Sequence, residues 1–203
     1  MLKKIPSTKG TFGTPADGTV NSVDAQLLAI EEALRQDECT ASVPFDNALN
    51  LITDYKVGRY LGFKLVNIEK HGFDCYREED GAFLESKVAS LGSKSWNATF
   101  NDTTVAKANE FKKSNVWLAL SVWKDFDAPL FILFGQHVGI GEFLERRVLN
   151  RKKGSRSTQS LSASKLYNEF GFKFIVPRKS LEDFRNIVVP RFKCVDEERI
   201  VVI

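Results

Sequence analysis

The chain lacks the features of membrane and secreted proteins. It has no apolar run near the roughly 18 residues that a membrane-spanning helix needs, and its first residues lack the continuous apolar stretch of a secretory signal. Cysteine is scarce, with only three residues in 203. Their odd number and wide spacing (Cys39, Cys75 and Cys194) argue against a disulfide framework. We therefore expect no membrane association and a reducing, cytoplasmic location.

Two further classes of protein, zinc proteins and nucleotide-cofactor enzymes, lack support in the sequence. The only histidines are His71 and His137, and no Cys/His spacing suggests a zinc site. Gly139 and Gly141 are similar to a phosphate-binding turn, but the chain completes neither a GxGxxG nor a Walker pattern. We predict no nucleotide cofactor.

The net charge is also small, at +3, because an acidic part of the chain offsets a basic part. Residues 1–145 carry 15 Lys and Arg against 20 Asp and Glu, whereas residues 146–203 carry 14 against 6. A basic C-terminal part beside an acidic body favours a polyphosphate partner. The alternative is a solvated basic surface near a flexible end.

Hydrophobic patterning predicts one mixed α/β domain over residues 1–203, with a central mixed sheet flanked by helices. Residues 1–20 form an irregular arm, and residues 24–134 form the core. The core is predicted to run through helices 24–36 and 45–57, strands 63–68, 73–76 and 82–89, a polar loop 90–101, helix 103–113, and buried strands 116–123 and 130–134. After it we expect helices 141–149, 160–170 and 180–186 and a strand 172–176.

Asp74, Glu85 and Lys87 form the most suggestive chemical group. Glu85 and Lys87 share one face of a predicted strand because side chains alternate along it, and Asp74 lies on the preceding strand. Two facing carboxylates suit Mg²⁺, which prefers oxygen ligands. Lys87 is placed to orient or deprotonate a water or to stabilise charge on a phosphoryl group.

The Glu-x-Lys pattern is weak by itself, since similar triplets begin at Asp54 and Glu110. Both of those fall in predicted helices, and only Glu85 lies on a strand that follows a strand-borne Asp. The alternative is an ordinary surface Glu–Lys pair, which contributes little to stability.

Gly72-Phe73-Asp74 followed by Phe83-Leu84-Glu85-Ser86-Lys87 resembles the PD-(D/E)xK nuclease superfamily, which includes the type II restriction endonucleases. The predicted order of helix, three-stranded meander, helix and strand is similar to that superfamily's core. Phe73 stands where the motif often has proline. The resemblance implies that Asp74 and Glu85 bind Mg²⁺, or Mn²⁺ in its place, and that Lys87 is catalytic. Some members add an acidic residue from the preceding helix, and we prefer Glu31 to its neighbour Glu32 for that role.

Two segments offer contacts to nucleic acid. The loop after the Glu85 strand is dense in small hydrogen-bonding side chains, and Trp96 there either stacks on a base or anchors the core. The second segment concentrates cations after residue 146, and the alternative for it is a solvated loop. The predicted DNA-binding residues are Lys94, Trp96, Asn97, Asn101, Thr103, Thr104, Lys107, Arg151, Lys152, Lys153 and Arg156.

Together these features predict a Mg²⁺-dependent endonuclease that cuts double-stranded DNA, most readily a type II restriction enzyme. The HNH and His-Me kinds of nuclease need a histidine motif that is missing. Cutting both strands of a palindrome with one small site implies a homodimer, for which Trp117, Trp123 and residues 199–203 offer surface. The alternatives are a structure-specific repair or recombination nuclease and a non-catalytic DNA-binding protein.

Overall fold

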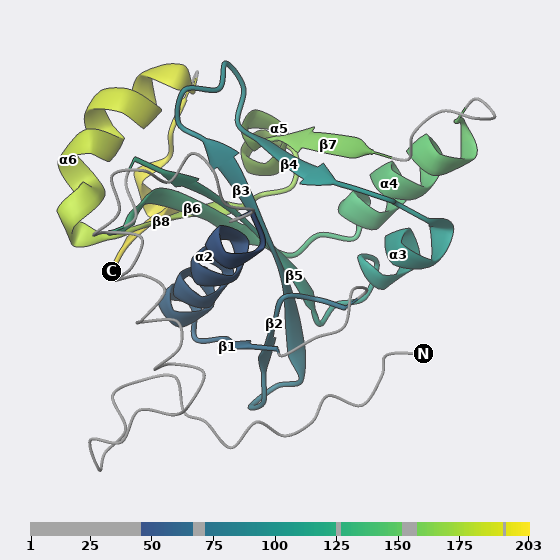
Figure 1. The fold of residues 1–203 in the computed structure, drawn as a ribbon. Coiled ribbons are helices and arrows are strands. Elements are labelled where there is room, and N and C mark those ends of the chain that lie inside the picture. The colour runs from purple at the N-terminus through teal and green to yellow at the C-terminus, as the bar shows by residue number, and fades with distance from the viewer. Residues whose placement is uncertain (1–45, 67–71, 125–126, 152–157, 193) are drawn as a thin grey trace, which may run out of the picture.

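The computed structural model describes residues 46–66, 72–124, 127–151, 158–192 and 194–203. They form a mixed α/β fold with a seven-stranded sheet flanked by helices (Figure 1), as the hydrophobic pattern predicts. Several residues singled out above lie outside the described residues: Glu31, Glu32, Cys39, His71, Lys152, Lys153 and Arg156. The N-terminal arm and the helix expected at 24–36 also lie outside them.

The first described helix, α2 (Asp46–Leu61), continues four residues past its expected end at 57. Gly58 does not stop it, because this glycine lies against the sheet. A Cβ added there would be 3.0 Å from Sγ of Cys75 and 3.1 Å from the carbonyl oxygen of Phe63. The stop is Gly62, whose φ of 74° is a left-handed conformation that glycine adopts without steric cost.

The large sheet has the strand order β1-β2-β3-β5-β6-β8-β9. Strands β1 to β3 form an antiparallel meander, and β3 then pairs in parallel with β5. β6 pairs antiparallel with both β5 and β8, while β9 joins β8 in parallel at the edge. The strands are β1 (Lys64–Leu65), β2 (Cys75–Arg77), β3 (Ala82–Ser90), β5 (Val116–Trp123), β6 (Pro129–Gly135), β8 (Lys173–Val176) and β9 (Ile200–Val202).

The connection from β3 to β5 differs from the prediction. The polar loop expected at 90–101 contains a strand, β4 (Asn97–Phe100), which pairs antiparallel with β7 (Gln159–Ser162) in a separate two-stranded sheet. Helix α3 (Val105–Glu110) is shorter than the expected 103–113, and Thr104 is its N-cap. The prediction missed β4 because its inward residues, Ala98 and Phe100, are buried by tertiary contacts that local composition does not reveal.

The helix expected at 160–170 is also replaced by a strand and a shorter helix. Its first residues belong to β7, and α5 (Ala163–Asn168) begins only after Ser162, whose hydroxyl accepts the amide of Lys165 as an N-cap. α4 (Gly139–Leu149) starts two residues earlier than predicted. At the C-terminus, consecutive 3₁₀, α and π turns from Arg178 to Arg191 replace the short helix expected at 180–186.

The close crossing of α3 and α4 explains Gly141. A Cβ at this position would lie 2.5 Å from the carbonyl oxygen of Ala108 and 2.9 Å from the amide of Lys112. Such distances are shorter than van der Waals contact, so only glycine lets the two helices approach this closely. Packing between α4 and α3 therefore accounts for this glycine without a phosphate ligand.

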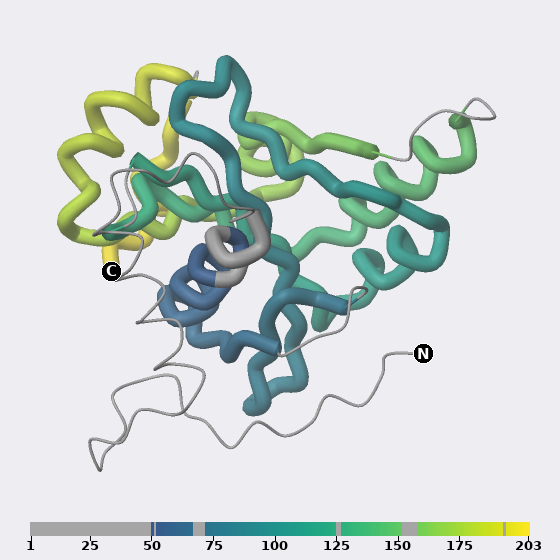
Figure 2. The backbone as a smooth tube through the Cα atoms, in the orientation of Figure 1, coloured from purple at the N-terminus to yellow at the C-terminus, as the bar shows by residue number. Residues whose placement is uncertain are grey.

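Two apolar cores lie on the two faces of the sheet. One face packs against α2 through Ile52, Tyr55 and Val57. The other is covered by α3, α4, α5 and the C-terminal turns (Figure 2). Most of the buried phenylalanines belong to this second core. Alternate residues of β5 enter opposite cores, with Leu118 and Leu120 on one side and Ala119 on the other. Among the described residues, no helix is long and apolar enough to cross a membrane.

Candidate functional site

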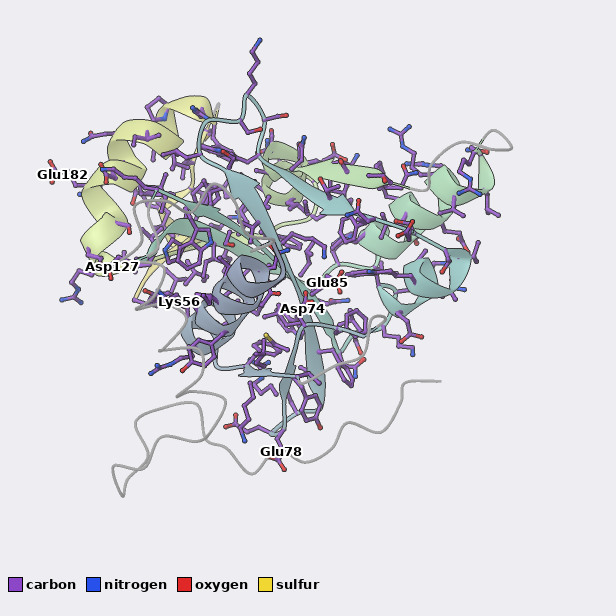
Figure 3. The ribbon with its side chains drawn as sticks, in the orientation of Figure 1. Lys56, Asp74, Glu78, Glu85, Asp127 and Glu182 are labelled. Atoms are coloured by element: carbon purple, nitrogen blue, oxygen red, sulfur yellow. The ribbon has the colours of Figure 1, made fainter. Side chains whose placement is uncertain are left out.

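Asp74 and Glu85 lie opposite each other on the meander. Cys75 pairs with Leu84 in the antiparallel register of β2 and β3, so the residues next to that pair, Asp74 and Glu85, also face each other. The Asp74 amide donates to the Leu84 carbonyl at 3.0 Å, and Oδ2 of Asp74 accepts the amide of Ser86 at 2.7 Å. Figure 3 shows the two carboxylates side by side near the middle of the molecule.

Glu85 is almost fully buried, with 2% of its surface exposed. Its Oε1 accepts Nζ of Lys87 at 2.7 Å and Nζ of Lys107, from α3, at 3.1 Å. Its Oε2 is buried and has no hydrogen-bond partner among the described residues. One carboxylate oxygen therefore faces two ammonium groups, while the other is desolvated without compensation, an arrangement that is costly unless a further ligand completes it.

Asp54 of α2 is a third carboxylate that interacts electrostatically with Asp74 and Glu85. From the sequence alone, its triplet looks like a chance match within a helix. A signal was present, because Asp54 precedes Val57 and Gly58 by three and four residues, and positions at that spacing share one helix face. Both Val57 and Gly58 are buried, so Asp54 borders the face that meets the sheet.

The three carboxylates do not ionise alike. Burial, followed by the charges of Glu85 and Asp54, raises the pKa of Asp74 to about 8. Burial also raises the pKa of Asp54 to about 6, although the Ser86 hydroxyl and Lys87 oppose that rise. The Ser86 contact is weak, because its Oγ has no hydrogen bond of regular geometry among the described residues. Near neutral pH, Asp74 therefore holds a proton.

Glu85 and Lys87, in contrast, both keep their charges. Burial favours a raised pKa for Glu85, but the charges and hydrogen bonds of Lys87 and Lys107 outweigh burial and lower that pKa. Burial likewise opposes the charge of Lys87, yet Glu85 and Asp74 raise its pKa above the usual value. Lys87 is consequently an ammonium ion here, which suits it to stabilising negative charge better than to removing a proton from water.

The donor set fits a hard divalent cation. It consists of carboxylate oxygens alone, one of which, Oε2 of Glu85, is buried without a partner among the described residues, and such oxygens are the ligands that Mg²⁺ prefers. In the part of the chain that the structure describes, no three Asp, Glu, His or Cys side chains already converge as a complete ligand set. Asp74 and Glu85 are the residues that could hold such an ion, with Asp54 contributing charge nearby.

The residues predicted to bind DNA occupy different environments. Lys94, Asn101, Thr104 and Arg151 are exposed, and Asn97 is half-buried. Thr103 is buried, and its hydroxyl donates to the Phe100 carbonyl at 3.1 Å. Lys107 reaches into the site and contacts Glu85.

Trp96 is a core residue with only 3% of its surface exposed. Its ring packs edge-on against Phe131, with the centroids 5.1 Å apart, and Arg191 covers it at 4.4 Å. Its indole nitrogen donates to the Leu91 carbonyl. The core-anchor alternative therefore describes Trp96, and the ring offers no face on which a base could stack.

Comparison of the chain with protein-family models, with curated proteins and with solved structures gives no match.

Proposed function

We propose that this protein is a Mg²⁺-dependent endonuclease that hydrolyses phosphodiester bonds of double-stranded DNA, most readily as a type II restriction enzyme. The observation that carries the proposal is the buried cluster in which Glu85 faces Asp74 and bonds Lys87, while its Oε2 has no partner among the described residues. Carboxylates and an ammonium ion brought together on neighbouring strands are the groups that metal-assisted phosphodiester hydrolysis requires.

In this proposal Asp74 and Glu85 hold the cation, and Asp54 adds negative charge behind them. Bound Mg²⁺ would supply Lewis acidity toward a phosphoryl oxygen. Asp74 would give up its proton when the ion binds, because a cation favours the charged form of a neighbouring carboxylate. Lys87 would stabilise the negative charge that develops on the phosphoryl oxygens.

The element order supports the same proposal. α2, the β1–β3 meander, α3 and β5 follow one another in an order similar to the one that the PD-(D/E)xK resemblance implies, with β4 inserted before α3. Asp74, Glu85 and Lys87 are the residues that carry the motif of that resemblance. Asp54 would be an acidic residue that a preceding helix contributes to the site, whereas Glu31 and Glu32 lie outside the described residues. The absence of proline before Asp74 does not affect this geometry, because Asp74 is fixed through its amide and carboxylate.

Exposed polar and basic residues would hold the duplex. Arg151 follows α4 and opens the segment that contributes Lys152, Lys153 and Arg156, while Lys94 and Asn101 flank β4. Cations bind the phosphate backbone through release of counterions and do not read sequence. Cutting both strands of a palindromic site would require a two-fold homodimer, which light scattering of the free protein can test.

The direct test is incubation with long duplex DNA and Mg²⁺, with EDTA as a control. Discrete fragments would support a restriction enzyme, whereas cutting confined to branched or damaged DNA would indicate a repair or recombination enzyme. Asp74→Asn, Glu85→Gln and Lys87→Met should abolish cleavage and leave DNA affinity largely intact. Glu110→Gln is the matched control, because Glu110 also pairs with a lysine, Lys113, outside the site. DNA binding without cleavage by any divalent cation would overturn the enzymatic proposal.

A further inference from the structure

Lys107 occupies an unusual position in the site. It is the second ammonium group on a single carboxylate oxygen, Oε1 of Glu85, which Lys87 already bonds at the shorter distance. Lys87 comes from the same strand as Glu85, whereas Lys107 comes from α3. Of the two lysines, Lys107 has the more accessible side chain, at 33% exposure against 21%.

The backbone around Lys107 is fixed, although its side chain is partly exposed. Its amide donates to the Thr104 hydroxyl at 3.1 Å, which caps α3. The preceding turn is held by the buried Thr103, which bonds the Phe100 carbonyl. α3 is also held from the other side by its close contact with Gly141 of α4. The stem of Lys107 is therefore anchored, while its flexible end can move over a few ångströms without moving the helix.

We infer that Lys107 competes with the divalent cation for Glu85, and that it transfers to a phosphate oxygen of the DNA when the cation binds. This inference rests on the proposed function, and it assigns Lys107 to substrate binding within the site. A cation on Glu85 repels the nearby ammonium ions. Lys107 is the more accessible of the two lysines, so breaking its ion pair with Glu85 costs less free energy than breaking that of Lys87. The nearest anionic group for the released ammonium is then the phosphate that the metal attracts.

Two physical consequences separate this role from an ordinary ion pair. Removal of the Lys107 charge relieves the competition, so it should strengthen binding of the metal in the absence of DNA. Removal of a purely structural ion pair would instead loosen α3 and weaken or leave unchanged the affinity for the metal. Once the cation is bound, replacement of Lys107 by a neutral residue should weaken the DNA complex, because it removes a charge-assisted hydrogen bond to phosphate.

The experiment titrates the full-length protein with Mn²⁺ by calorimetry, without DNA. We expect Lys107→Met to lower the Kd for Mn²⁺ by about two- to fivefold, the effect of removing a partly exposed ion pair. Lys107→Arg keeps the charge and should bind Mn²⁺ like the wild type. Lys107→Gln is the second neutral variant, for use if the methionine substitution impairs folding, and thermal unfolding of each variant verifies the fold.

Lys112→Met is the matched control. Lys112 forms an ion pair of similar length, 2.9 Å, with Glu145, and its side chain has a similar exposure of 30%. This control should leave the Mn²⁺ affinity unchanged. In cleavage assays with Mg²⁺, Lys107→Met should raise KM for duplex DNA with a smaller effect on kcat, and Lys112→Met should change neither.

The outcomes distinguish the two proposals. If the wild type binds no Mn²⁺, the metal site of the proposed function is wrong. If the wild type binds Mn²⁺ and the neutral Lys107 variants bind it equally or more weakly, only the role of Lys107 is overturned. Tighter binding by the neutral variants alone, together with the rise in KM, supports the competition.

Discussion

Asp74 combines an architectural role with a chemical one. Asp74 immediately precedes β2, and its carboxylate accepts the amide of Ser86 on the neighbouring strand β3. The same carboxylate has a pKa raised to about 8 by burial and by Glu85 and Asp54. An amide at this position can still accept the hydrogen bond through its carbonyl oxygen, so Asp74→Asn removes the ionisation and keeps the contact.

The raised pKa of Asp74 predicts how the stability of the protein depends on pH. The folded-state pKa values of Asp74 and Asp54, about 8 and about 6, both lie above the ordinary value of 3.8. Between these limits the folded state binds more protons than the unfolded state, so the contribution of both groups to stability is present at low pH and is lost as pH rises toward 8. In EDTA, the Tm of the wild type should therefore fall between pH 5 and pH 8.5 more steeply than that of Asp74→Asn.

The control for this prediction is Asp80→Asn. The pKa of Asp80 is lowered by its hydrogen bond to Arg77 on the surface, so this substitution should not flatten the decline. Equal pH slopes for the wild type and Asp74→Asn would contradict the raised pKa of Asp74. Saturating Mg²⁺ should reduce the slope of the wild type, because the ion replaces the proton.

At the scale of elements, the contact between α3 and α4 determines where Lys107 is presented. We predict that Gly141→Ala lowers the free energy of unfolding by about 1–3 kcal/mol, the usual cost of overpacking. The added methyl group meets backbone atoms of Ala108 and Lys112, which cannot rotate away as a side chain can. Urea denaturation measures the effect.

Gly92→Ala provides the matched comparison for this substitution. Gly92 has no atom within 4 Å of an added Cβ, so its replacement should change stability by less than about 0.5 kcal/mol. Similar losses of stability for the two variants would show that backbone flexibility, and not the crossing of the helices, explains Gly141.

Some elements were predictable from the sequence and others were not, for physical reasons. β5 was predicted at its observed bounds, because Val116 to Trp123 is an apolar run interrupted only by Ser121 and covered on both faces of the sheet. Such a run is a strong local signal. β4 and β7 were missed because each is a short polar-faced strand whose partner lies about 60 residues away. The irregular turns after Arg178 likewise depend on contacts of Phe184 and Val188 with the core.

The site was predictable to a similar degree. Asp74, Glu85 and Lys87 belong to one hairpin, so strand alternation was sufficient to place them together. Lys107 contacts Glu85 from α3, and Asp54 interacts with it electrostatically from α2. Spacing along a helix indicates which face meets the sheet, but the angle at which the helix packs cannot be read from its own residues. For Trp96 the sequence left both base stacking and core packing open, with core packing the commoner role of a tryptophan, and its burial identifies core packing.

At the scale of the whole molecule, the basic charge and the acidic site occupy different parts of the fold. Arg151 follows α4, whereas Asp74 and Glu85 lie on the meander (Figure 1). Replacement of Arg151, Lys152 and Lys153 by glutamine should weaken DNA binding regardless of sequence. It should also reduce the slope of log Kd against log salt by about 2 to 3, close to one unit for each phosphate that the protein no longer neutralises.

A control with equal removal of charge uses Lys173, Arg178 and Arg185, which are exposed on β8 and the C-terminal turns. This variant should keep the salt dependence of the wild type. If both triple variants reduced the slope equally, the contribution of the basic segment would be one of overall charge and not of direct binding to phosphates.

The hairpin that joins Asp74 and Glu85 also affects how the protein assembles. Its two carboxylates are separated by 11 residues, whereas Asp54 and Lys107 reach Glu85 across 31 and 22 residues. Contacts between nearby residues close faster than distant ones, so a refolding chain brings Asp74, Glu85 and Lys87 together before Lys107 arrives from α3. During that interval Lys87 alone balances the two acids, because it lies on the same strand as Glu85. Lys107 would thus complete the charge balance of the site late in folding, after the hairpin has formed.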